Sequence, residues 1–152
     1  LLTAILTPLS RVLLSTCLVL FSGLSLAQVD IPDAKVSQGI EYISGGIGSE
    51  ESDAMLVLGK KWPLVLEFSQ DHPQRPLWVA DVTVKILDQK KKIVFEALSD
   101  GPIMLLKMNP GKYDAEYSFE GKVLKRSLVV EEATIDENKP PLLVYREAAK
   151  KA

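Results

Sequence analysis

The fold is decided by residues 78–86, which read WVADVTVKI. Apolar side chains recur at every second position from Trp78 to Ile86, while Asp81, Thr83 and Lys85 take alternate positions. A period of two is typical of a β-strand with one side in the core and the other in solvent. We therefore predict one strand here, with Trp78, Ala80, Val82, Val84 and Ile86 facing the core.

The same alternation recurs on both sides of this stretch, and turns separate the runs. Polar and apolar residues alternate at 64–69, 93–97, 104–108, 113–119 and 124–130, and shorter apolar runs occupy 40–43 and 142–145. Asn109-Pro110-Gly111-Lys112 favours a type II turn, and Glu120-Gly121 favours a tight hairpin. Prolines before 142–145 favour an edge position for that strand.

Half-buried strands of this kind bury their apolar sides when two sheets pack face to face. We therefore expect a mainly β chain that forms a single antiparallel β-sandwich of seven to eight strands over residues 40–147.

One short helix is expected before the sandwich strands, within residues 44–59. The segment Ser44-Gly45-Gly46-Ile47-Gly48-Ser49 reads as a glycine-rich loop. Ser49 suits the N-cap position, and Glu50 and Glu51 would lie in the first turn, where the helix dipole favours negative charge. Gly59 would end the helix.

The first 27 residues differ from the rest and predict a signal peptide. Arg11 is followed by a short apolar run, and Ser25 and Ala27 stand at the −3 and −1 positions of a cleavage site. Residues 28–39 would be a flexible lead-in, and 148–152 a frayed tail. We expect an exported protein, periplasmic or secreted, with no stable membrane insertion after signal cleavage.

Composition narrows the classes of function. The chain has 18 basic and 20 acidic residues, so no global field draws it to nucleic acid. It holds one cysteine and one histidine, which excludes a disulfide framework and a cysteine-rich zinc site. We expect no metal and no cofactor.

Three segments are similar to parts of one known domain: residues 80–88 to its opening strand, Ser99-Asp100-Gly101 through Leu106 to its middle strand, and Asn109-Pro110-Gly111-Lys112-Tyr113 to its Leu-Pro-x-Gly-x-Tyr turn. The chain therefore resembles the carboxypeptidase regulatory-like domain, which implies a β-sandwich of transthyretin-like or immunoglobulin-like architecture. Residues 119–121 and 127–130 resemble the final hairpin. The resemblance covers about residues 64–131, and the glycine-rich front end looks like that of small exported bacterial proteins of unassigned function.

The resemblance implies a non-catalytic module. Its enzymatic relatives, the transthyretin-related hydroxyisourate hydrolases, rely on several histidines and a terminal Tyr-Arg-Gly-Ser. Here Tyr145-Arg146 is followed by Glu147-Ala148, and His72 is the only histidine. A hydrolase that uses His72 with Asp71 or Arg75 remains the enzymatic alternative.

The glycine-rich loop and the start of the helix form the candidate partner-binding site. Its residues are Ser44, Gly45, Gly46, Gly48, Ser49, Glu50 and Glu51. Backbone N–H groups of such a loop could bind an anion, although the nearby acids oppose this. The other possibility is a purely structural loop that lets the backbone pass close to the sheet.

Four other features are better explained by structure than by function. They are His72 in a turn, Lys90-Lys91-Lys92 at a hairpin tip, the acids Glu131, Glu132, Asp136 and Glu137, and the aromatic residues Trp62, Trp78, Tyr113, Tyr117 and Phe119. The functional alternative for His72 is a metal ligand, and for the three lysines it is contact with an anionic surface. For the acids it is a calcium site, and for the aromatic residues it is a carbohydrate-binding platform.

The function that we expect is an exported, non-catalytic binding or accessory module that recognises a protein or an envelope component. Recognition would involve the glycine-rich loop, the helix or an exposed strand edge that pairs with a partner strand. The alternatives are the His72 hydrolase and a structural or adhesin-type subunit.

Overall fold

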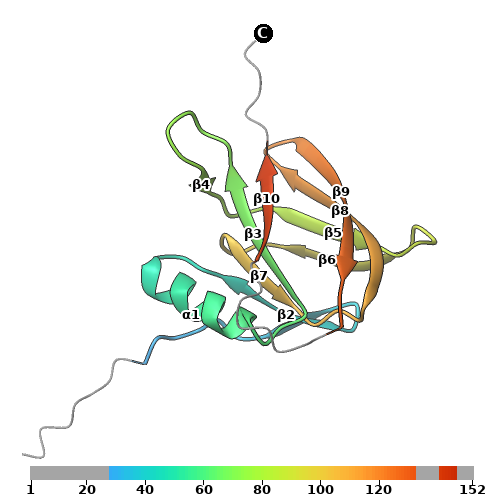
Figure 1. Cartoon of the computed structure of the whole chain (residues 1–152), viewed down its shortest axis with the longest axis horizontal. Helices are drawn as coiled ribbons and strands as arrows, with labels where there is room; N and C mark the ends of the chain where they lie inside the picture. Colours follow the sequence, from blue (N-terminus) through green and yellow to red (C-terminus); the bar gives the residue numbers. More distant parts are fainter. Residues whose placement is uncertain (1–27, 133–140, 147–152) are drawn as a thin grey trace, which may run out of the picture.

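The computed structural model describes residues 28–132 and 141–146. The predicted signal peptide at 1–27 and the predicted frayed tail at 148–152 lie outside these residues. The described chain forms two β-sheets that face each other, with one helix on the outside of one sheet (Figure 1).

Within the described residues, the first sheet has six strands and the second has four, so the predicted number of seven to eight strands is too low. The first sheet has the order β1 (Lys35–Ser37), β2 (Ile40–Gly45), β7 (Ile103–Leu106), β3 (Leu64–Gln70) and β10 (Leu142–Arg146), and β4 (Leu77–Trp78) pairs with the end of β3. The second has the order β6 (Ile93–Leu98), β5 (Thr83–Leu87), β8 (Gly111–Phe119) and β9 (Lys122–Val130). Helix α1 spans Ser49–Gly59.

The inner faces of the two sheets build the main hydrophobic core. Leu66 and Phe68 of the first sheet meet Val84, Ile86 and Phe95 of the second, and all five are buried. Aromatic contacts join the layers, since the rings of Phe68 and Tyr117 lie 6.1 Å apart between centroids. The mainly β fold with two packed sheets and one short helix is confirmed.

Helix α1 covers the outer face of the first sheet and creates a second core. Met55 of the helix, with Trp62 after it, packs on Ile43, Ile103 and Leu105. The expectation that every strand has one solvent-facing side is therefore wrong for β7. All four residues of β7 are buried, because the sandwich covers one face and the helix covers the other.

Residues 78–86, predicted as one strand, are divided between the two sheets. Trp78 belongs to β4 in the first sheet, whereas Val84 and Ile86 belong to β5 in the second. Asp81 has a φ of 58°, and this left-handed residue turns the chain from one sheet to the other. Val82, Val84 and Ile86 are buried as predicted, but Trp78 is 50% exposed, so its predicted core position is wrong.

Ser99 holds this crossing in place. Its hydroxyl oxygen accepts a hydrogen bond from the Val82 N–H at 3.0 Å, and its own N–H donates to the Val82 carbonyl at 2.9 Å. Its carbonyl accepts the Asp81 N–H at 3.0 Å. Ser99 is fully buried, so these bonds satisfy the polar groups that the crossing would otherwise leave unpaired in the interior.

Two predictions about strands need correction. Part of the segment assigned to a flexible lead-in, residues 35–37, forms β1 and pairs with β2. The Ser37 hydroxyl donates to the Glu96 carbonyl of β6 at 2.6 Å, so β1 also joins the edges of the two sheets. In addition, the sheets are antiparallel except at β10, which runs parallel to β3, at the edge of the sheet as predicted.

The two predicted turns have different outcomes. Glu120 and Gly121 have φ values of 47° and 77° and connect β8 to β9, so the tight hairpin is confirmed. Gly111 has a φ of 157°, far from the roughly 80° of a type II turn, and begins β8. The Tyr113 hydroxyl donates to the Asn109 carbonyl at 2.8 Å, which holds the chain as it enters β8.

Substitution Val84→Asp tests the core that the alternation predicted. Val84 is fully buried between the sheets, so an aspartate there would be a buried charge without a partner. We expect the free energy of unfolding to fall by about 3–5 kcal/mol in chemical denaturation. The control is Thr83→Asp, on the opposite face of the same strand. Equal effects of the two changes would mean that the faces of β5 are assigned incorrectly.

Candidate functional site

The structure divides the predicted partner-binding site into a buried half and an exposed half. Ser44 and Gly45 end strand β2, and both are buried, as is Gly46. Gly48, Ser49 and Glu50 are exposed. Ile47, which the sequence analysis did not include in the site, is 67% exposed at the tip of the loop.

The buried half positions the connection between β6 and β7. The Ser44 hydroxyl oxygen accepts the Asp100 N–H at 2.8 Å. Gly101 lies directly on the backbone of Gly45, and a Cβ atom on Gly101 would be 2.2 Å from the Gly45 carbonyl oxygen. These residues therefore join two backbone segments that are distant in sequence, and a partner has no access to them.

The glycine-rich loop does form an anion-binding turn, but the protein supplies the anion. Glu51 Oε1 accepts the N–H of Gly46 at 2.7 Å and the N–H of Ile47 at 3.2 Å. Ser52 Oγ lies 2.6 Å from the carbonyl oxygens of both Gly46 and Gly48. Because the Glu51 carboxylate occupies these donors, an external phosphate or carboxylate would have to displace it.

The start of the helix also differs from the prediction. Ser49 is the first helical residue, and Gly48, with a φ of 83°, takes the N-cap position without a side-chain cap bond. Glu51 and Ser52 instead bind the loop from within the first turn, as described above. The helix itself and its end at Gly59 are confirmed.

His72 lies in the exposed loop between β3 and β4 and is far from a catalytic arrangement. Its Nδ1 accepts the backbone N–H of Gln74 at 3.4 Å. Among the described hydrogen bonds and ion pairs, none joins His72 to Asp71 or Arg75. No three metal-ligating side chains gather anywhere in residues 28–132 and 141–146. Of the acids for which calcium binding was the alternative, Asp136 and Glu137 lie outside the described residues.

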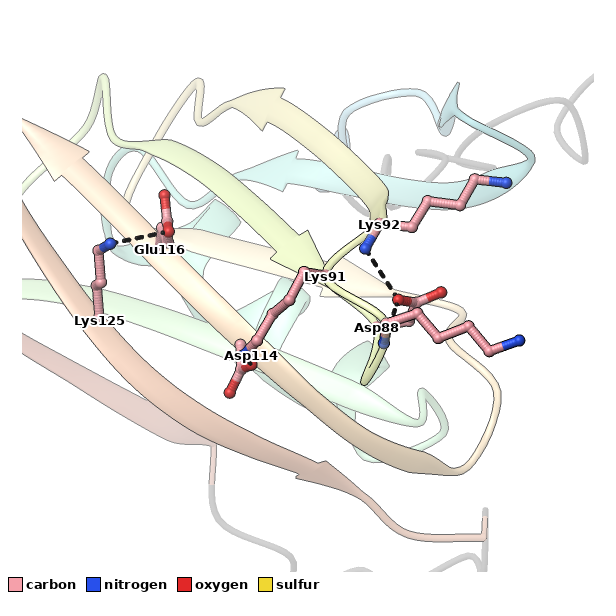
Figure 2. Close-up of polar contacts among 7 residues, drawn as sticks. Asp88, Lys91, Lys92, Asp114, Glu116 and Lys125 are labelled. Carbon is pink, nitrogen blue, oxygen red and sulfur yellow. Dashed lines mark hydrogen bonds and ion pairs between the residues drawn. The ribbon is translucent and has the colours of Figure 1, made fainter.

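The three lysines at 90–92 lie at the β5–β6 turn, and the turn itself is built by Asp88 (Figure 2). Asp88 Oδ1 accepts the N–H groups of Lys90 at 2.8 Å and of Lys92 at 3.0 Å. The Lys91 ammonium pairs with the Asp114 carboxylate of β8. The ammonium groups of Lys90 and Lys92 extend into solvent.

The aromatic side chains do not form one platform. Trp62 is buried under the helix, where the Lys107 ammonium lies 4.8 Å from its ring centroid. Tyr117 is buried between the sheets, and this burial raises the pKa of its hydroxyl. Trp78, in contrast, lies on the surface.

Trp78 is the residue that the sequence analysis missed. It lies in β4, which pairs with β3 in a projecting hairpin (Figure 1). An open groove of about 350 Å³ lies against it. Arg75, Pro76, Leu77 and Trp78 line this groove, and we call them the hairpin surface. The alternation gives no signal of the exposure of Trp78, because Asp81 occupies a regular polar position in it; the one local indication is that aspartate tolerates the positive φ at which the chain turns.

The hairpin surface and the exposed tip of the glycine-rich loop lie at the same end of the first sheet. Gly45 and Glu67 both pair with Ile103, and β3 continues beyond that position to pair with β4. The residues after Gly45 and the β3–β4 hairpin therefore both extend past the end of β7. Exposed apolar side chains at this end are Ile47, Leu77 and Trp78.

Comparisons with known proteins found no protein-family model that matches this sequence and no solved structure with a significant match. Within the described ranges, no helix has both the length and the apolar character needed to span a membrane.

Glu51→Ala tests the assignment of the loop anion. The change leaves the partly buried N–H of Gly46 and that of Ile47 without their acceptor, so we expect the free energy of unfolding to fall by about 1–3 kcal/mol. The control is Glu50→Ala, an exposed acid in the same turn, for which about 0.5 kcal/mol is expected. If the two variants melt at the same temperature, Glu51 does not hold the loop.

Proposed function

We propose that this protein is an exported, non-catalytic binding module that recognises a protein or an envelope component through the hairpin surface. The observation that carries the proposal is the half-exposed ring of Trp78 beside Arg75 and Leu77 at an open groove. Tryptophan is highly buried on average in folded proteins, and tryptophan and arginine are enriched among the residues that dominate the binding energy of protein interfaces.

The hairpin surface is attached to a rigid support. Trp78 and Leu77 pair with Ser69 and Gln70 of β3, and the Val79 N–H donates to the Phe68 carbonyl at 3.2 Å. Pro73 and Pro76 restrict the backbone of the loop. A partner that binds here would pay little conformational entropy to order the site.

We place the main binding site at the hairpin surface, and not at the glycine-rich loop, because of the structure of the loop. Its buried donors are already used by Glu51, and its exposed tip offers mainly Ile47. We therefore propose that the loop tip contributes apolar contact beside the hairpin surface and that Trp78 is the anchor. Within residues 28–132 and 141–146, no geometric observation favours the hydrolase or the adhesin-type alternative.

The remaining parts of the proposal rest on the sequence. Export is supported by Arg11, the apolar run after it, and Ser25 and Ala27 at the cleavage site. A transthyretin-like domain of the carboxypeptidase regulatory-like kind is supported by the motifs over residues 64–131. The resemblance to such a domain is what supports a non-catalytic role.

Trp78→Ala tests the anchor. The full chain would be tagged at its C-terminus, produced in its native host and crosslinked in the cell envelope before capture. We expect the variant to lose its crosslinked partner, because truncation of an interface anchor costs about 2 kcal/mol or more, roughly 30-fold in affinity. The control is Val57→Ala, which shortens an apolar side chain that is 64% exposed on α1.

Thermal unfolding of both variants shows whether the fold is intact. A partner that both folded variants retain as well as the parent does would place recognition away from the hairpin surface.

Export is tested by determining the N-terminal residue of the protein isolated from the envelope fraction. We expect mass spectrometry to show a chain that begins at Gln28, and Ala27→Phe to accumulate the uncleaved chain, since the cleavage site requires a small residue. Recovery of an uncleaved parent chain from the cytoplasmic fraction would contradict export.

A further inference from the structure

A second surface, formed by strand β9, has the properties of a docking edge. Within the described residues, β9 pairs with β8 on one side and with no strand on the other. It is nine residues long, and it carries three cations, Lys122, Lys125 and Arg126, and no acid. An edge strand of this length presents a row of backbone donors and acceptors to an incoming strand.

Positive charge is concentrated in the layer to which β9 belongs. Segments 83–98 and 111–130, which contain all four strands of the second sheet, hold eight basic and five acidic residues. Their net charge is +3, whereas the whole chain has a net charge of −2. This layer therefore attracts an acidic partner although the protein as a whole is acidic.

The charges on the outer face of this sheet alternate across the strands. Register places Glu96 opposite Lys85, Lys85 opposite Glu116, and Glu116 opposite Lys125. Lys85 and Glu96 approach to 3.9 Å, and Lys125 and Glu116 to 3.3 Å, the latter pair visible in Figure 2. This row, Glu-Lys-Glu-Lys, ends on a lysine at the open edge.

The neighbours of Lys125 define what a further strand would meet. Val123 and Val129 lie on the same face of β9 and are 57% and 60% exposed. The guanidinium of Arg126 donates to the Lys125 carbonyl at 3.1 Å, and no ion pair involves it in the described chain.

We propose that the free edge of β9 binds an extended acidic segment of a partner protein as an additional antiparallel strand. An acidic residue opposite Lys125 would continue the alternating row, a second acid beside it would meet Arg126, and apolar residues would face Val123 and Val129. Cross-strand pairs of opposite charge and of apolar side chains stabilise such a pairing. The same cations repel basic strands and discourage self-pairing, so they select the partner.

This inference goes beyond the hairpin surface and stands on different residues, so either can fail alone. The probe is the synthetic peptide acetyl-GSVVTEETVGS-amide, whose two glutamates would lie opposite Arg126 and Lys125 in antiparallel register. The isotope-labelled full chain is titrated with the peptide to about 1 mM, the weak end of specific affinities, and followed by NMR. We expect the amide signals of β9 to shift and to gain protection from hydrogen exchange.

Two matched comparisons test the role of charge. Arg126→Glu in the protein, or glutamine for both glutamates in the peptide, is expected to weaken binding by ~10-fold or more. The control Lys61→Glu makes the same charge change at an exposed residue next to the first sheet and is expected to alter the affinity by less than about twofold.

Three results would overturn the proposal. They are no shift of β9 amides at the highest peptide concentration, shifts confined to other strands, and equal weakening by Lys61→Glu and Arg126→Glu. The last would mean that the peptide responds to net charge alone and not to the edge of β9.

Discussion

The contact between the backbones of Gly101 and Gly45 is the constraint on which the rest of this structure depends. Only a residue without a side chain fits at position 101, because a Cβ atom there would overlap the Gly45 carbonyl. Around this contact, Ser44 binds Asp100 and Ser99 binds Val82. These bonds fix two of the places where the chain crosses between the sheets, from β4 to β5 and from β6 to β7, and these two crossings lie at one end of the molecule. The hairpin surface and the tip of the glycine-rich loop extend from that end, so the same constraint also positions the candidate site.

Glu51 explains why a loop with the composition of an anion site has a structural role. Buried backbone N–H groups need an acceptor, and the first turn of the helix supplies one from within the chain. A site whose donors are already matched gains little from an external anion. What remains available to a partner is apolar and aromatic surface, which points to recognition by burial of Trp78 and its neighbours. The proposed binding role depends on that surface.

The two proposed surfaces differ in kind. The hairpin surface offers an aromatic ring and a guanidinium on a projecting loop that two prolines restrict. The β9 edge offers backbone hydrogen bonds and an unfinished row of alternating charges. One surface suits a compact anchor and the other an extended acidic strand. A protein with both could hold two partners, or two segments of one partner, and the second arrangement would raise the overall affinity through effective concentration.

By itself, the sequence determined which side of most strands is buried, where the helix ends and where the β8–β9 hairpin turns. These features depend on local alternation and on turn residues, so Val82, Val84, Ile86 and Gly121 could be assigned correctly. The exposure of Trp78 could not be predicted, because the alternation runs unbroken through Asp81 while the backbone changes sheets there. Likewise, the burial of both faces of β7, the pairing of β1 and the parallel direction of β10 depend on which segments come to lie beside them. Periodicity specifies the two faces of a strand, but what covers each face is decided by contacts between residues that are distant in sequence, and only the tertiary structure contains those.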